Sequence, residues 1–217
     1  MKLSALVIAL GMAFSGSAFA ATAVWDTAAP WGSATTTQYA EWNVFNGTSD
    51  NSPEVSLSAE TTASVTENTG LAFLTGGNIY SWQAPTSFTA NLSGSGATGG
   101  LFDVYLRIGT LGSVANVTAT LNGVSAAATS VQTIGETTIV MGGVSAEQEV
   151  YWKWAGVSSA SLYTFNFSAS SSSMSLDQLA LATVAVTAVP EPETYSMMAL
   201  GLGLMAFVAR RSRKNQA

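Results

Sequence analysis

The sequence predicts an all-β body, a two-sheet sandwich with a jelly-roll-like arrangement, for three reasons. Only 9% of the 217 residues are charged, which is too few for the polar faces of a helical bundle. Apolar and polar residues alternate at period two along several segments. Pairs of Gly or Asn-Gly separate these segments and mark turns. The six Trp, six Tyr and nine Phe then supply the large side chains that a buried core needs.

Alternation is clearest in three segments, 102–108, 150–154 and 163–167, each of which places its larger apolar residues on one face. In the first segment the opposite face carries Asp103, Tyr105 and Arg107. Near the end of the body Met174 and Leu176 share one phase, whereas Leu179 and Leu181 share the other. This change of phase predicts a β-bulge around Asp177-Gln178.

Other segments that predict strands are shorter or less regular, and turn pairs such as Asn46-Gly47 and Asn122-Gly123 separate them. They cover 38–45, 54–59, 71–74, 87–92, 114–121 and 137–141. About ten strands at this spacing favour a two-sheet sandwich. We place this body at 21–182 and a linker at 183–189.

The charge of the body excludes one class of partner. Its two basic residues, Arg107 and Lys153, stand against eleven acidic ones, so its formal charge is −9. Phosphate-rich polymers are repelled by such a surface, and nucleic-acid binding is not expected. The chain has no Cys and no His, which removes disulfides, thiolate chemistry and the common catalytic triads.

The first twenty residues predict a cleaved secretory signal peptide. Lys2 gives a positive start, and an apolar stretch follows at 3–14. The small residues Ala18 and Ala20 fit the two pockets of signal peptidase, so we expect cleavage before Ala21.

The C-terminal end has three parts in order. Pro190-Glu191-Pro192 is held extended by its prolines, and an apolar run at 195–209 predicts a short transmembrane helix. A basic tail follows, which should stay cytoplasmic and leave the body on the other side of the membrane. This tail consists of Arg210, Arg211, Arg213 and Lys214.

This tripartite end, 190–214, resembles the PEP-CTERM sorting signal, in which a Pro-Glu-Pro motif precedes a short transmembrane helix and an Arg-rich tail. The resemblance implies recognition by exosortase, a membrane enzyme that cuts near the motif. It also implies a Gram-negative producer, often one that makes exopolysaccharide and biofilm matrix. The expected route is transient anchoring in the inner membrane and then the cell surface or the extracellular matrix.

Few residues of the body point to chemistry. Glu147 and Glu149 share one strand face and would be a carboxylate pair for glycoside hydrolysis, although exposed Glu at a strand start is more often solvated. Asp50, Asn51 and Glu54 have oxygens suited to Ca²⁺, but their pattern favours an ordinary turn. Asp177 in the last predicted strand resembles a position at which jelly-roll binding modules hold a metal or a sugar. We expect no enzyme activity, no cofactor and no metal.

The tryptophans divide into two groups. Trp42 alternates with apolar Val44, which predicts a core position. Trp25, Trp31 and Trp82 lie in loop-like sequence, where flat rings could stack on sugars, although core packing is the commoner role.

The sequence therefore favours an exported, non-catalytic surface or matrix protein associated with exopolysaccharide. The alternative is a carbohydrate-binding module for exopolysaccharide, and a less favoured one is a small glycan-active enzyme.

Overall fold

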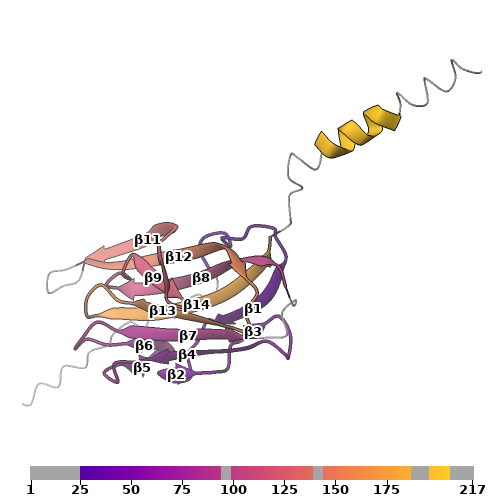
Figure 1. The fold of residues 1–217 in the computed structure, drawn as a ribbon. Helices are drawn as coiled ribbons and strands as arrows, with labels where there is room; N and C mark the ends of the chain where they lie inside the picture. The colour runs from indigo at the N-terminus through magenta and orange to yellow at the C-terminus, as the bar shows by residue number, and fades with distance from the viewer. Residues whose placement is uncertain (1–24, 94–98, 139–143, 187–195, 206–217) are drawn as a thin grey trace, which may run out of the picture.

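The computed structural model describes residues 25–93, 99–138, 144–186 and 196–205. Its body consists of two antiparallel sheets that pack face to face (Figure 1). The prediction of an all-β body built from two sheets is confirmed.

The larger sheet, sheet A, has eight strands in the order β11-β12-β8-β14-β1-β3, with β6 paired to β14 and β5 paired to β6. Their bounds are β11 (Ser130–Thr138), β12 (Val144–Ser158), β8 (Leu101–Gly112), β14 (Met174–Ala185), β1 (Thr36–Trp42), β3 (Val55–Ser56), β6 (Asn78–Tyr80) and β5 (Phe73–Thr75).

The smaller sheet, sheet B, has six strands in the order β10-β9-β13-β7-β4-β2. Their bounds are β10 (Val124–Ala127), β9 (Thr118–Leu121), β13 (Leu162–Ser168), β7 (Ser87–Ser93), β4 (Thr62–Glu67) and β2 (Ser49–Asp50).

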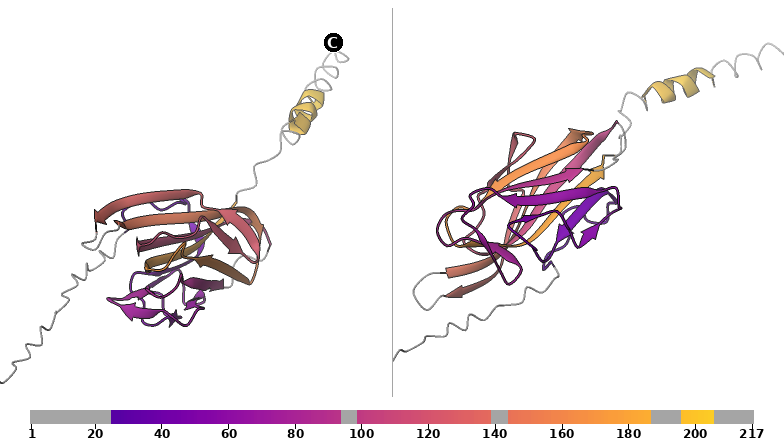
Figure 2. Two further views of the ribbon diagram at one scale, coloured as in Figure 1. Left: turned by 90° about the vertical axis from the view of Figure 1, so that its left-hand side faces the viewer. Right: turned by 90° about the horizontal axis from the view of Figure 1, so that it is seen from below.

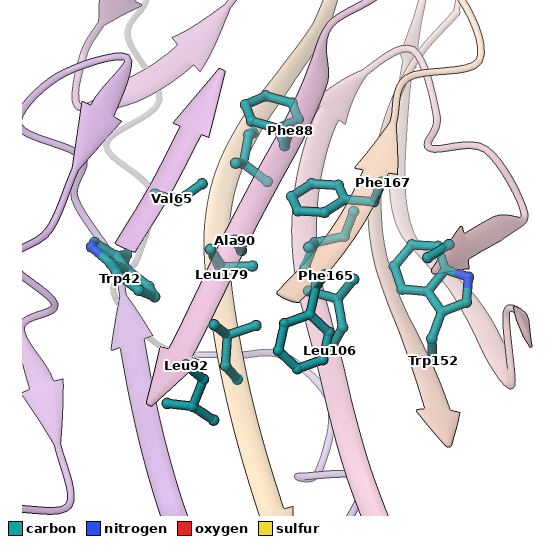
Figure 3. Packing of buried hydrophobic residues seen from close by; sticks show 14 of the residues in the cluster. Trp42, Val65, Phe88, Ala90, Leu92, Leu106, Trp152, Phe165, Phe167 and Leu179 are labelled. Carbon is teal, nitrogen blue, oxygen red and sulfur yellow. The ribbon is translucent and has the colours of Figure 1, made fainter. Parts of the chain in front are cut away.

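The core lies between the sheets and is made by the inward residues of both (Figure 3). Phe88 and Phe167 stack at 4.9 Å between ring centroids, and Trp42 is fully buried as predicted. Trp152 and Trp154 are buried too, and their indole N–H groups donate to the backbone carbonyls of Val117 and Val124 at 2.9 and 3.0 Å. Large rings therefore fill the space between the sheets without leaving a buried indole donor of β12 unpaired.

The predicted bulge in the last strand is confirmed. The register between β14 and β8 shifts between Leu176 and Gln178, so Asp177 is the extra residue. Leu176 and Leu179 both reach the core because the bulge changes the phase of the strand. Gly109 of β8 faces the bulge of β14, and a Cβ atom added to Gly109 would lie 3.2 Å from Oε1 of Gln178.

Several boundaries differ from the sequence prediction. The four strands β2, β4, β6 and β10 were not expected, since their sequences are short or alternate only small residues, such as Ala63 and Val65 in β4. The last strand β14 continues to Ala185, three residues into the predicted linker. The pairing of β14 with β8 extends to Ala185, opposite Phe102, which explains the longer strand.

The C-terminal helix covers 196–205 among the described residues and appears in yellow in Figure 2. Its large apolar side chains, including Met197, Leu200 and Leu204, are exposed. Within the part of the chain that the structure describes, no helix has both the length and the apolar character needed to cross a membrane. The predicted signal peptide, the Pro-Glu-Pro motif and the basic tail lie outside the described residues.

Candidate functional site

The most elaborate cluster of side chains lies on the outer face of sheet A, away from the core. Residues 25–34 run along this face and make a turn at 30–33; we call them the strap. Arg107 of β8 and Glu149 of β12 lie under the strap and are only 3% and 6% exposed. Alternation places both residues opposite the core, so the strap rather than the sandwich buries them.

Arg107 and Glu149 form an ion pair that also binds the strap. Nη2 of Arg107 lies 2.7 Å from Oε2 of Glu149 and donates to the carbonyl and the hydroxyl of Thr27 at 2.7 and 2.8 Å. The carboxylate of Glu149 accepts from the backbone N–H of Asp26 at 2.6 Å and from the N–H and hydroxyl of Thr27. Each charge is therefore compensated by the other and by hydrogen bonds, which burial requires.

Aromatic rings complete the contact between the strap and the sheet. The ring of Trp25 lies 4.0 Å from Cζ of Arg107, and its Nε1 donates to Oε1 of Glu41 at 3.1 Å. Trp31 packs edge-on against Tyr39 and Tyr105, with centroids 5.6 and 5.8 Å apart. These contacts combine cation–π attraction with apolar burial and hold the strap in one register.

The hydroxyl of Tyr39 donates to the carboxylate of Glu41 beside Trp25. Burial, together with this hydrogen bond, raises the pKa of Tyr39 above its usual range. Tyr39 therefore stays a neutral donor at physiological pH.

The three tryptophans proposed for sugar stacking do not meet in one platform. Trp25 and Trp31 are half-buried and are engaged in the strap contacts. Trp82, which follows β6, is 62% exposed and shares no ring contact with either of them among the described residues.

A cavity of about 220 Å³ opens beside the ion pair. The strap supplies Thr27, Ala28 and Pro30 to its wall, and β11 and β12 supply the rest together with Arg107. The remaining lining residues are Ser130, Gln132, Glu149, Val150 and Tyr151. Because the charged groups in this wall are already paired with each other and with the strap, the cavity lacks a free nucleophile or base at Glu149.

Glu147 lies two residues before Glu149 and shares its strand face. Desolvation raises its pKa, and the neighbouring charges of Asp26, Asp177 and Glu149 raise it further. The sequence interpretation of two solvated carboxylates is wrong for Glu149, since the strap covers it, and holds better for the half-exposed Glu147.

The acidic loop after β1 behaves as a turn. Oδ2 of Asp50 accepts from the N–H of Asn46 at 2.7 Å, and Oδ1 accepts from the N–H of Ser52 at 2.8 Å. Glu54 accepts from the N–H of Asn43 at 2.9 Å, and Asn51 hydrogen-bonds Ser52. These carboxylates cap backbone donors. Within the described ranges no three His, Cys, Asp or Glu side chains are grouped as metal ligands.

Asp177 is 7% exposed at the bulge of β14. Its Oδ1 atom is buried without a hydrogen-bond partner, and Asn78 hydrogen-bonds the carboxyl group. Burial raises the pKa of Asp177 above its usual value. Burial therefore disfavours the charged form of this carboxyl group.

Sequence reasoning missed the pairing of Arg107 with Glu149. A signal was present, because Arg107 is one of only two basic residues in the body and lies within the apolar stretch 102–108. A lone cation in such a strand calls for a buried carboxylate partner. Its partner lies 42 residues away along the chain, which spacing alone does not reveal.

The sorting residues Pro190, Glu191 and Pro192, the basic residues Arg210, Arg211, Arg213 and Lys214, and the cleavage residues Ala18, Ala20 and Ala21 lie outside the described residues. Comparison with known families shows that residues 188–214 match the PEP-CTERM protein-sorting motif. The chain is a PEP-CTERM sorting domain-containing protein. The matched range includes the Pro-Glu-Pro motif and all four basic residues of the tail. The PEP-CTERM motif marks an exported protein that is processed by an exosortase.

No curated protein and no solved structure matches the chain.

Proposed function

We propose that this PEP-CTERM protein is a non-catalytic component of the cell surface or extracellular matrix of a Gram-negative bacterium, associated with exopolysaccharide and biofilm. The match at 188–214 carries the proposal, since it supplies the sorting route. Signal peptidase would cut before Ala21, and the apolar run 195–209 would anchor the chain in the inner membrane until exosortase processes it.

The arrangement of the charged groups supports a non-catalytic body. A glycosidase needs two carboxyl groups free to exchange protons across a sugar. Glu149 instead accepts hydrogen bonds from Arg107 and from the strap, so it is held as a structural anion. On the strand face of Glu147, Glu149 is therefore already committed to Arg107 and the strap.

We infer further that the body is a jelly roll, and the strand order supports this. Sheet A contains β12-β8-β14-β1 and sheet B contains β10-β9-β13-β7, each in that order. The first strand, β1, pairs with the last, β14. Between them the chain crosses from β7 in sheet B to β8 in sheet A, to β9 and β10 in sheet B, to β12 in sheet A and to β13 in sheet B. Two interlocked Greek keys have this order.

The test of the sorting role is a double substitution, Pro190→Ala with Pro192→Ala. It leaves the hydrophobicity of the tail nearly unchanged while it loosens the extended backbone of the motif. We expect the variant to insert normally but to stay uncleaved and membrane-bound in the native host. Blots of the membrane and released fractions compare it with wild type.

A matched control changes Pro85, which lies in the body before β7, to Ala. This control should be processed like wild type. Identical processing of the double variant and wild type would reduce the tail to a plain membrane anchor and remove the basis of the proposal.

The alternative function, a carbohydrate-binding module, is not favoured by the tryptophans, because Trp25 and Trp31 are used within the protein. Its support comes from a different surface, the outer face of sheet B.

A further inference from the structure

The outer face of sheet B has an unusual composition. Its central row takes one outward residue from each of the six strands, and every one is Ser, Thr or Asn. We call this set the hydroxyl row; it runs Ser49, Thr66, Thr89, Asn166, Thr120 and Ser125. Because neighbouring strands lie about 4.8 Å apart, the hydroxyl row is about 24 Å long.

The positions beside the hydroxyl row have the same chemistry. Ser64, Asn91 and Thr164 form a second row on β4, β7 and β13. Thr62 and Ser93 continue it on one side, and Ser87 and Ser168 lie on the other. The exposed apolar residues Leu162 and Val124 lie at the ends of strands, at the margin of the face.

The face carries no ionisable side chain among its described residues. The strands of sheet B contain only two acids, Asp50 and Glu67, and both are buried. Asp50 caps backbone donors of its own turn, and Glu67 accepts from the N–H groups of Thr69 and Gly70 at 3.0 Å. The body has a formal charge of −9, so this neutral surface differs from the acidic character of the body as a whole.

The side chains of the face are held in place by one another. Ser49 and Thr66 are 2.9 Å apart, Thr89 donates to Asn166 at 2.9 Å, and Asn166 donates to Thr120 at 3.4 Å. In the second row Thr164 donates to Asn91 at 2.9 Å, and Asn91 donates to Ser64 at 3.4 Å. A side chain ordered before binding loses less entropy on binding, so the face is preorganised.

The composition selects the kind of partner. A protein interface core needs aromatic and apolar anchors, which the rows lack. An acidic polymer would meet no cation here and a strongly negative protein elsewhere. Hydroxyl and amide groups both donate and accept hydrogen bonds, and they match a partner with the same two capacities along its length. Neutral polysaccharides have such groups on every residue.

We propose that the hydroxyl row and its flanking Ser, Thr and Asn side chains bind a neutral polysaccharide. A single exchange of neutral hydrogen bonds for water contributes little, so a small sugar is held weakly. A polymer or an insoluble polysaccharide surface contacts many side chains at once. Because its sugar residues are covalently linked, one contact raises the effective concentration of the next, and the overall affinity increases. The face thus recognises extended polysaccharide rather than free monosaccharide.

This inference deepens the matrix role proposed above, because it names the polymer class and the face that meets it. Its failure is distinguishable from failure of the sorting proposal. A protein that is processed normally but not retained on polysaccharide would refute this inference alone.

The test measures retention of the purified full-length protein on three neutral polymers, namely microcrystalline cellulose, cross-linked dextran beads and agarose beads. Alginate beads are the acidic comparison. Wild type should be retained on at least one neutral polymer, should not be retained on alginate, and should keep its retention in high salt. Retention on none of the three neutral polymers, or preferential retention on alginate, would overturn the proposal.

The row variant Thr66→Ala/Thr89→Ala/Thr120→Ala locates the site and should bind at least tenfold more weakly. The matched control Ser56→Ala/Thr75→Ala/Thr133→Ala removes three exposed hydroxyls from strands of sheet A and should stay within twofold of wild type. Equal retention of the row variant and wild type would overturn the assignment of this face.

Three single variants, one of them a control, keep the test decisive if the row variant folds poorly. Asn166→Asp preserves shape but places a charge at the centre of the hydroxyl row, and it should lose binding, whereas Asn51→Asp in an exposed loop should not. Thr89→Ser keeps the hydroxyl and should retain binding. A regular hydroxyl array also suits ice, so inhibition of ice recrystallisation without retention on any polymer would reassign the face and overturn the proposal.

Discussion

The two outer faces of the sandwich differ in the charged side chains that they carry. The outer face of sheet A holds the buried pair Arg107 and Glu149 under the strap. The outer face of sheet B has Ser, Thr and Asn in its rows and nothing ionisable among its described residues. The same β architecture therefore supports a closed, charged face and an open, neutral one.

The difference shows which contacts select a single arrangement of the chain in a protein with few charges. A buried ion pair contributes little net stability, but it strongly disfavours any arrangement that leaves one charge alone. On sheet A the pair fixes the register of the strap. On the outer face of sheet B the described residues make neutral hydrogen bonds with one another, so that face can exchange its partners for water or polymer at small cost.

The largest effect should follow from breaking the ion pair. Glu149→Ala leaves Arg107 buried with no carboxylate, and we expect a loss of about 3–5 kcal/mol in the free energy of unfolding, measured by urea titration. Glu147→Ala on the same strand face is the control and should change stability by about 0.5 kcal/mol or less.

A paired replacement sharpens this result. Arg107→Met with Glu149→Leu removes both charges and should recover most of the loss, since apolar residues of similar volume often replace buried pairs without cost. Equal stability of Glu149→Ala and Glu147→Ala would mean that the strap does not bury the pair in solution.

A smaller effect, of opposite sign, is expected at Asp177. Its folded pKa is raised by burial, so the native state binds the proton more tightly than the unfolded chain does. Stability from this group is therefore present at low pH and is lost as pH rises past the ordinary carboxyl range. Asp177→Asn should be more stable than wild type at neutral pH by about 1 kcal/mol, the low end for a buried charged acceptor without a partner.

The pH dependence provides the check. Thermal melts at neutral pH and near pH 3 should show the advantage of Asp177→Asn shrinking as the wild-type carboxyl becomes protonated. A variant that is less stable than wild type at neutral pH would show that the hydrogen bond with Asn78 outweighs the cost of burying the carboxylate.

The sequence predicted those parts of the molecule that local pattern determines. Alternation identified the inward faces of β8, β12 and β13, and the change of phase identified the bulge at Asp177. β4 was missed because its inward residues Ala63 and Val65 are too small to produce a clear apolar period.

The site was harder to predict because it depends on contacts between distant residues. Glu149 meets Asp26 across 123 positions of the chain, and alternation alone assigned its face to solvent. The hydroxyl row is likewise invisible in the sequence, since its six members come together only through the strand order of sheet B. The presence of the sorting motif was predicted from the sequence, because the motif is a contiguous signal.

The last comparison makes the same chemical change on each face, and its smaller effect is expected on sheet B. Thr27→Ala removes the strap hydroxyl that accepts from Arg107 and donates to Glu149, and we expect a loss of about 1–2 kcal/mol, typical of hydrogen bonds to charged groups. Thr89→Ala removes a hydroxyl of the open face that bonds only neutral partners, Asn68 and Asn166, so we expect about 0.5 kcal/mol or less. Both substitutions delete the same atoms, which cancels most of the change in the unfolded state. The difference between them, read from urea midpoints at constant m-value, therefore reports the burial and charge of the surroundings. If Thr89→Ala cost as much as Thr27→Ala, the outer face of sheet B would be covered in solution, and it would not be free to meet a polysaccharide.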